Sequence, residues 1–64
     1  MEQVKWEQAH NMLETMGLRV KDMQRVSSVD GWMKSVAVVP EGRLVRYTSM
    51  SRDHRATEYY LQEV

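Results

Sequence analysis

The dipeptide Asp30-Gly31 stands directly before the aromatic and β-branched run from Trp32 to Val39, and it constrains the fold more than any other feature of the chain. Asp-Gly is a strong signal for a tight hairpin turn, and a valine-rich run after it is typical of a β-strand. One helical stretch precedes this turn and further strand-like segments surround it, so the sequence predicts a small α+β domain. The run contains no nucleophile, metal-ligand set or phosphate-binding loop, so it predicts a fold class but no chemistry.

The length and composition exclude several classes of protein. The 64 residues suit one domain, which we expect to span residues 1–64. Nine basic and nine acidic residues give a net charge of zero, which argues against non-specific binding to nucleic acid or to an anionic membrane. The chain has no cysteine, no signal-peptide pattern and no apolar run of the roughly 20 residues that a membrane span needs. We therefore expect a cytoplasmic protein, and its small core favours a protein partner or a homodimer.

Residues 2–16 carry apolar side chains at the three- and four-residue spacing of an amphipathic helix. Gly17 follows and offers the left-handed conformation that commonly ends a helix. A helix of this length matches a strand of about six or seven residues, so we expect it to lie across one face of a sheet. The apolar stripe consists of Trp6, Ala9, Leu13 and Met16.

Four later segments are predicted as strands of an antiparallel meander. The predicted fold is one N-terminal helix packed on a sheet of three or four strands. The first segment does not alternate cleanly between polar and apolar residues, which predicts a bulge or a late start. The last segment also fits a short helix capped by Asp53, although we prefer a strand. The predicted strands are residues 19–28, 32–39, 44–50 and 57–64, with a turn at 40–43.

Both faces of the strand at 32–39 carry apolar residues, so alternation alone does not identify the buried face. We expect Trp32, Val36 and Val38 to point into the core, with Trp32 packing against Trp6 across the helix–sheet interface. The alternative places the small Ala37 beneath the helix.

Basic and aromatic residues gather in the C-terminal third of the chain. Arginines interleaved with tyrosines are typical of surfaces that bind single-stranded nucleic acid. The simpler interpretation, which we prefer, is a solvated sheet face whose arginines pair with Glu41, Asp53, Glu58 and Glu63. The candidate partner-binding residues are Arg43, Arg46, Tyr47, Arg52, Arg55 and Tyr59, with His54 and Tyr60 beside them.

Patterns for catalysis and metal binding are weak in this chain. Arg52-Asp53-His54 resembles a set of acid–base residues, but no nucleophile accompanies it and a polar turn explains it better. His10 and His54 lack carboxylate or thiolate partners at metal-ligand spacing. We therefore expect no enzymatic activity, no cofactor and no metal site.

Taken together, these segments resemble gas vesicle protein O, a family of small accessory proteins of gas vesicle gene clusters. That family combines a helix with an A-x-x-x-L-like stripe, an acidic-Gly-Trp turn into a valine-ending strand, and a tyrosine-bearing last strand. The resemblance covers about residues 8–62, and PepSY-like small α+β domains share the Gly-Trp turn followed by valines. The matching positions are Ala9, Leu13, Asp30-Gly31-Trp32, Val36-Ala37-Val38-Val39, Arg46-Tyr47, Asp53, Thr57 and Tyr59.

The resemblance implies a cytoplasmic, non-enzymatic accessory factor that acts through protein–protein contacts. Our leading functional prediction is therefore a small protein-interaction module. The alternatives are a nucleic-acid-binding or regulatory domain that uses the Arg- and Tyr-rich C-terminal hairpin, and an inhibitor of a host protein encoded by a phage or mobile element.

Overall fold

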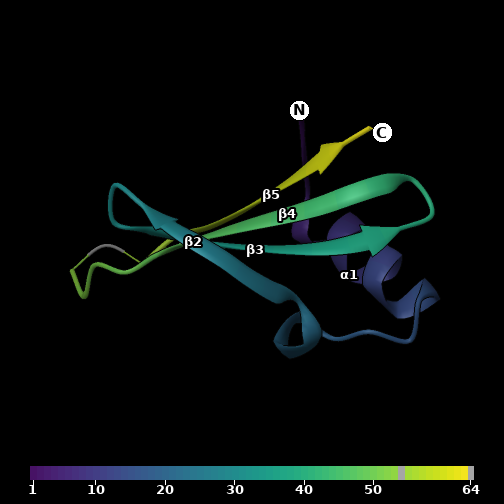
Figure 1. The fold of residues 1–64 in the computed structure, drawn as a ribbon, viewed down its shortest axis with the longest axis horizontal. Helices are drawn as coiled ribbons and strands as arrows, with labels where there is room; N and C mark the ends of the chain where they lie inside the picture. Colours follow the sequence, from purple (N-terminus) through teal and green to yellow (C-terminus); the bar gives the residue numbers. More distant parts are fainter. Residues whose placement is uncertain (54, 64) are drawn as a thin grey trace.

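The computed structural model describes residues 1–53 and 55–63, which form one helix and a five-stranded antiparallel sheet (Figure 1). The chain is therefore an α+β protein, as its sequence predicts. The strands lie in the order β1-β5-β4-β3-β2, so the two N-terminal strands form opposite edges of the sheet. The elements are β1 Glu2–Val4, α1 Trp6–Thr15, a 3-10 turn η1 Val20–Asp22, β2 Gln24–Val29, β3 Trp32–Val39, β4 Gly42–Ser49 and β5 Thr57–Gln62.

The first residues form a strand, β1, instead of the first turn of the helix. The sheet therefore has five strands rather than the three or four that the sequence predicts. In β1, Glu2 pairs with Leu61 and Val4 with Tyr59. An extended segment here satisfies backbone groups of β5 that an unpaired edge would leave to water. The helix begins only at Trp6, after Lys5, whose backbone N–H donates to the Gln8 side chain at 3.0 Å.

The predicted end of the helix at Gly17 is confirmed. Gly17 has a φ of +70°, in the left-handed region. Its N–H donates to the carbonyl of Glu14, and the N–H of Leu18 donates to the carbonyl of Leu13, both at 2.9 Å. This pair of hydrogen bonds is the Schellman motif, which satisfies carbonyls that the last helical turn leaves free.

The sequence predicts a bulge or a late start in the first meander strand, and the structure has both. The 3-10 turn occupies residues 20–22, so β2 starts only at Gln24. The pairing of β2 with β3 then shifts between Arg25 and Ser27, which marks a bulge at Val26. All six residues of β2 are exposed, as suits an edge strand with solvent beside it.

The Asp30-Gly31 hairpin turn is confirmed, and so are the strands on either side of it. Val29 pairs with Trp32, which leaves two residues in the turn, with φ values of +49° for Asp30 and +81° for Gly31. Positive φ at both central positions defines the type I′ turn, whose twist suits a two-residue hairpin. The last segment is a strand, β5, and the helical alternative for it was wrong. Val64, the end of the predicted strand, lies outside the described residues.

The face of β3 that we expected to point into the core lies away from α1, and on it Trp32 and Val36 are half-buried. Val38 is 72% exposed, whereas Val39 is buried and Ala37 packs against the core beneath α1. The alternative with Ala37 under the helix is therefore correct. α1 meets this face of the sheet through the fully buried Ala9 and Leu13, and the small side chains of Ala9 and Ala37 leave room for the helix to pack there.

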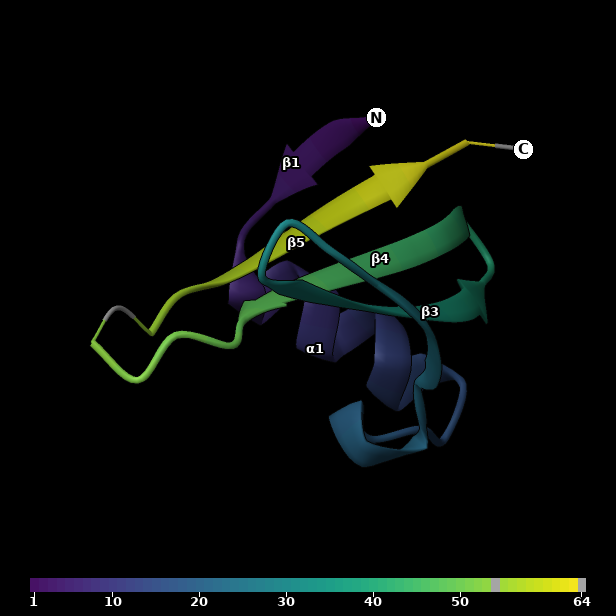
Figure 2. The same cartoon turned by 60° about the vertical axis from the view of Figure 1, so that its left-hand side comes forward.

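The core lies between α1 and one face of the sheet, and Figure 2 shows α1 behind β3 and β4. Trp6 is 61% exposed and does not pack against Trp32, so the predicted tryptophan pair was wrong. Its ring instead contacts His10 at 5.4 Å between centroids. The buried apolar cluster is made of Ala9, Leu13, Met23, Val39, Leu44 and Tyr59.

Candidate binding surface on the open sheet face

One face of the sheet packs against α1 and the opposite face, here called the open face, does not. In Figure 1, α1 lies behind β3 and β4, whereas the strongly twisted β2 crosses in front of them. The register places Val36, Val45 and Tyr60 in one row of the open face, and Lys34, Tyr47 and Glu58 in the next. Val45 is fully buried, so the middle of this face is shielded by its neighbours and its two ends carry the accessible side chains.

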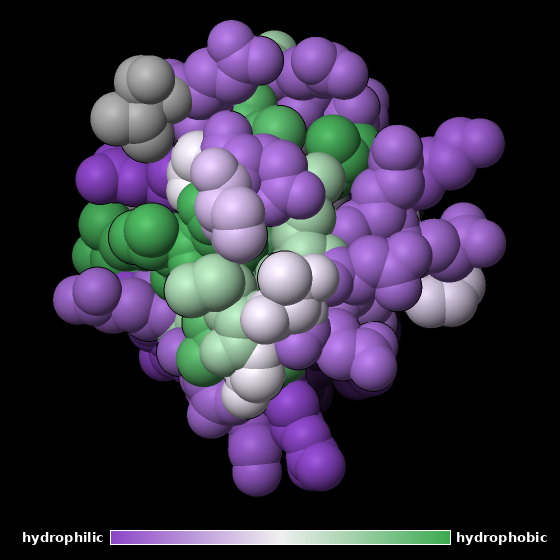
Figure 3. Space-filling model, turned by 90° about the vertical axis from the view of Figure 1, so that its right-hand side faces the viewer, coloured by the Kyte–Doolittle hydropathy of each residue, from purple (hydrophilic) through white to green (hydrophobic). Residues whose placement is uncertain are grey.

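One accessible end is the β3–β4 turn. Val38 of β3 lies near this turn and is the most exposed large apolar side chain of the described residues, at 72%. Arg43, opposite it on β4, is also exposed. Figure 3 shows apolar surface at this end of the molecule, rimmed by hydrophilic side chains.

The other accessible end holds a hollow of about 440 Å³, here called the aromatic hollow. Trp32 follows the type I′ turn and Tyr47 and Tyr60 come from β4 and β5, so three strands each contribute one ring. The rings of Tyr47 and Tyr60 stand at 78° with centroids 5.8 Å apart, which is the edge-to-face geometry that aromatic pairs prefer. The remaining lining residues are Met1, Val29, Asp30 and Glu58.

A carboxylate is fixed at the wall of the aromatic hollow. The Tyr60 hydroxyl donates a hydrogen bond to Glu58 Oε1 at 3.1 Å. This hydrogen bond, with partial desolvation and the negative charge of Glu58, raises the pKa of Tyr60 above its usual value of 10.0. Tyr60 is therefore neutral at physiological pH, and its hydroxyl acts as the donor to Glu58.

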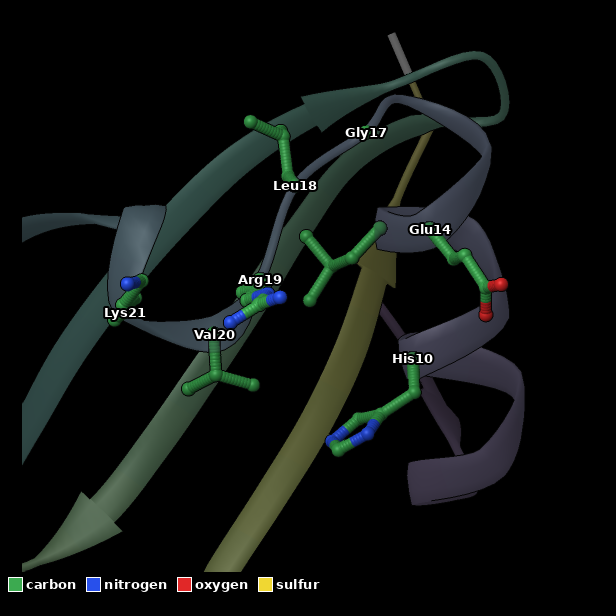
Figure 4. Close-up of a pocket in the computed structure, with 8 residues that line it drawn as sticks. His10, Glu14, Gly17, Leu18, Arg19, Val20 and Lys21 are labelled. Carbon is green, nitrogen blue, oxygen red and sulfur yellow. The ribbon is translucent and has the colours of Figure 1, made fainter.

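A second hollow, of about 660 Å³, lies between α1 and the segment that follows it (Figure 4). Figure 4 shows the His10 ring directed toward this hollow and the Glu14 carboxylate directed away from it. His10 Nε2 lies 3.3 Å from the Tyr59 hydroxyl, which also accepts a hydrogen bond from Arg46 Nε at 3.3 Å. The lining residues include no serine, threonine or cysteine that His10 could activate.

The six residues predicted as a binding set do not form one surface. Arg43 and Tyr47 lie on the open face, whereas Arg46 and Tyr59 lie on the face toward α1, because side chains alternate between faces along a strand. Tyr59 is 5% exposed, and its hydroxyl takes part in the network with His10 and Arg46. Arg52 and Arg55 lie between β4 and β5, and His54 lies outside the described residues.

The sequence analysis assigned Trp32 to the core beneath α1, whereas the structure leaves it half-buried at the aromatic hollow. The lengths of the two hairpin turns are the sequence signal that identifies the face on which Trp32 lies. Two-residue turns fix Val29 opposite Trp32 and Val39 opposite Gly42, and counting from them places Trp32 and Tyr47 on one face.

Comparison of the chain with family models, curated proteins and solved structures found no match. Among residues 1–53 and 55–63, no helix has the length and apolar composition needed to cross a lipid bilayer. Within the same residues, no group of three or more histidine, cysteine, aspartate or glutamate side chains is arranged to hold a metal ion.

Proposed function

We propose that this chain is a non-catalytic protein-binding module that contacts a protein partner through the open face. The observation that carries the proposal is the one-sided covering of the sheet by α1. It leaves Val38 72% exposed and Val29 50% exposed on or beside a face that also holds the aromatic hollow. Exposed apolar groups rimmed by polar residues are typical of interaction surfaces.

The chemistry of the two hollows supports a binding role. The hollow beside α1 offers His10, Glu14 and two basic residues, and the aromatic hollow offers rings and carboxylates. Among the described residues, neither lining set contains a serine, threonine or cysteine, the side chains that most often act as nucleophiles beside a base.

The resemblance to gas vesicle protein O gives this proposal its most specific form, a cytoplasmic accessory protein whose partner belongs to an assembling structure. An inhibitor of a host protein would use the same open face with a different partner. A nucleic-acid-binding role gains less support, because Arg43 and Arg46 lie on opposite faces of β4.

Light scattering coupled to size-exclusion chromatography tests the proposal with a matched pair of variants. Val38→Lys places a charge on the open face, and Met16→Lys places the same charge at the exposed end of α1, where Met16 is 46% exposed. We expect the wild-type chain to enter a larger complex with lysate from its source. Val38→Lys should abolish the complex and Met16→Lys should preserve it.

The remaining outcomes of this experiment are equally informative. A dimer of the purified chain that Val38→Lys dissociates would identify a second copy as the partner. A complex that nuclease treatment removes would favour nucleic acid instead. A monomeric mass under both conditions, or a complex that both variants retain, contradicts the use of the open face.

A further inference from the structure

The aromatic hollow combines features that suit one chemical class of ligand. We infer that it binds an alkylammonium group, of the kind that a lysine side chain of the protein partner presents. This inference rests on the proposed function, because it names the group through which the partner would engage the open face.

The rings supply the first part of the argument. Trp32, Tyr47 and Tyr60 line the hollow, and the near-perpendicular arrangement of the two tyrosines turns their π systems in different directions. A cation placed over the face of a tryptophan or tyrosine ring is attracted by its quadrupole. Rings on several sides of one hollow are the arrangement that recognises ammonium groups.

The carboxylates supply the second part. Asp30 and Glu58 both line the hollow, and among the described lining residues the only cationic group is the α-ammonium carried by Met1. The nearest basic residue in the register is Lys34, which is paired with Tyr47 on the same face but lies outside the lining set. Two carboxylates against one ammonium give the lining a net negative charge, which favours a cation over phosphate or carboxylate ligands.

The apolar lining and the size of the hollow complete the argument. Met1 and Val29 line it beside the rings, and they provide contacts for the aliphatic stem that carries a lysine ammonium. The volume of about 440 Å³ accommodates one such side chain. The hydrogen bond from Tyr60 holds Glu58 in place, so the negative wall is formed before a ligand arrives.

Fluorescence titration tests the inference in a Trp6→Phe background, where Trp32 is the single tryptophan of the chain. Trp6 is 61% exposed, so its replacement should leave the fold intact. The probes are N-acetyl-lysine amide, its trimethylated form and the neutral analogue N-acetyl-norleucine amide. We expect saturable binding of both cations with dissociation constants on the order of millimolar, and no saturation with norleucine.

A matched pair of variants locates the site. Glu58→Gln should weaken binding of the cationic probes by about five-fold or more, because it removes one charge from the wall. Glu14→Gln removes the same charge from the hollow beside α1 and should leave binding unchanged. Equal binding of norleucine, or equal binding by the wild-type chain and Glu58→Gln, would overturn the inference.

Two further comparisons distinguish a lysine side chain from a small free cation, and distinguish failure of this inference from failure of the proposed function. If butylammonium binds more tightly than the lysine probes, the ligand is a small free cation, and the inference that a lysine side chain occupies the hollow is wrong. Loss of the partner complex in Val38→Lys with no binding of cationic probes overturns this inference alone. Absence of any complex, with probe binding intact, contradicts the proposed function while the ammonium site stands.

Discussion

Thr48 places a polar atom, its Oγ1, in a buried position on the face of the sheet toward α1. Its Oγ1 is buried and has no hydrogen-bond partner among the described residues. Thr48 faces α1, since it alternates with the open-face residue Tyr47, and it pairs with Met33 on β3 and Thr57 on β5. A buried hydroxyl without a partner loses its hydration and gains nothing in return.

Thr48→Val should therefore stabilise the protein by up to about 1 kcal/mol, because valine has the same shape and no hydroxyl. Thr57→Val makes the same change at the exposed cross-strand partner and should alter the free energy of unfolding by less than about 0.5 kcal/mol. Urea denaturation of both variants checks the expectation. A clear loss of stability in Thr48→Val would show that the hydroxyl has a partner in solution.

Tyr60 and Glu58 give a second test at the residue scale. The pKa of Tyr60 is raised in the folded chain, so the corresponding stabilisation is fully present below the unfolded value of 10.0. It is lost as the pH rises through the folded-state pKa. Glu58→Gln should move the Tyr60 titration back toward 10.0, measured from ring carbon shifts by NMR. An unchanged Tyr60 titration would show that Glu58 is not the cause of the raised pKa of Tyr60.

At the scale of elements, α1 is held by two side chains on one stripe. Ala9 and Leu13 are 0% and 1% exposed, whereas Trp6 on the same predicted stripe is 61% exposed. The stripe predicts which side of the helix is apolar. Which residues of the stripe become buried depends on how the helix packs against β3 and β4.

Leu13→Ala should cost about 2–5 kcal/mol, because it opens a cavity at the fully buried contact between α1 and the sheet. A domain of this size has a total stability of about 3–10 kcal/mol, so this change should remove a large share of it and lower the melting temperature strongly. Trp6→Ala removes a larger side chain and should cost less than about 1 kcal/mol. Circular dichroism melts measure both, and the reverse ranking would place Trp6 in the core.

Sequence reasoning worked for elements whose signals are local. Asp30-Gly31 and Gly17 were recognised because positive φ restricts the residues that fit there. It failed for Glu2–Val4, whose strand forms only because β5 lies beside it, and for the buried face of β3, which α1 selects. It failed for the candidate site for the same reason, since Trp32 meets Tyr47 and Tyr60 through register across three strands.

At the scale of the whole molecule, stability should fall from the middle of the sheet toward both edges. β4 is hydrogen-bonded to β3 on one side and to β5 on the other, and Leu44 and Val45 in it are fully buried. At the β2 edge every residue is exposed, and at the other edge β1 has three residues. Edge strands with little burial open at lower free energy than central strands do.

Amide hydrogen exchange followed by NMR should therefore be slowest at Leu44 and Val45 and faster across β2. We expect at least about a hundred-fold difference in rate, which corresponds to about 3 kcal/mol in opening free energy. The rates in β2 should not depend on protein concentration. Protection of β2 that grows with concentration would instead identify this edge as a self-association site.

The pairing of β1 with β5 has a consequence for how the protein is made. Glu2 pairs with Leu61, so β1 is synthesised well before the strand with which it pairs. The helix also precedes every strand that covers Ala9 and Leu13. During translation the apolar stripe of α1 therefore stays exposed until the strands that bury it have been made.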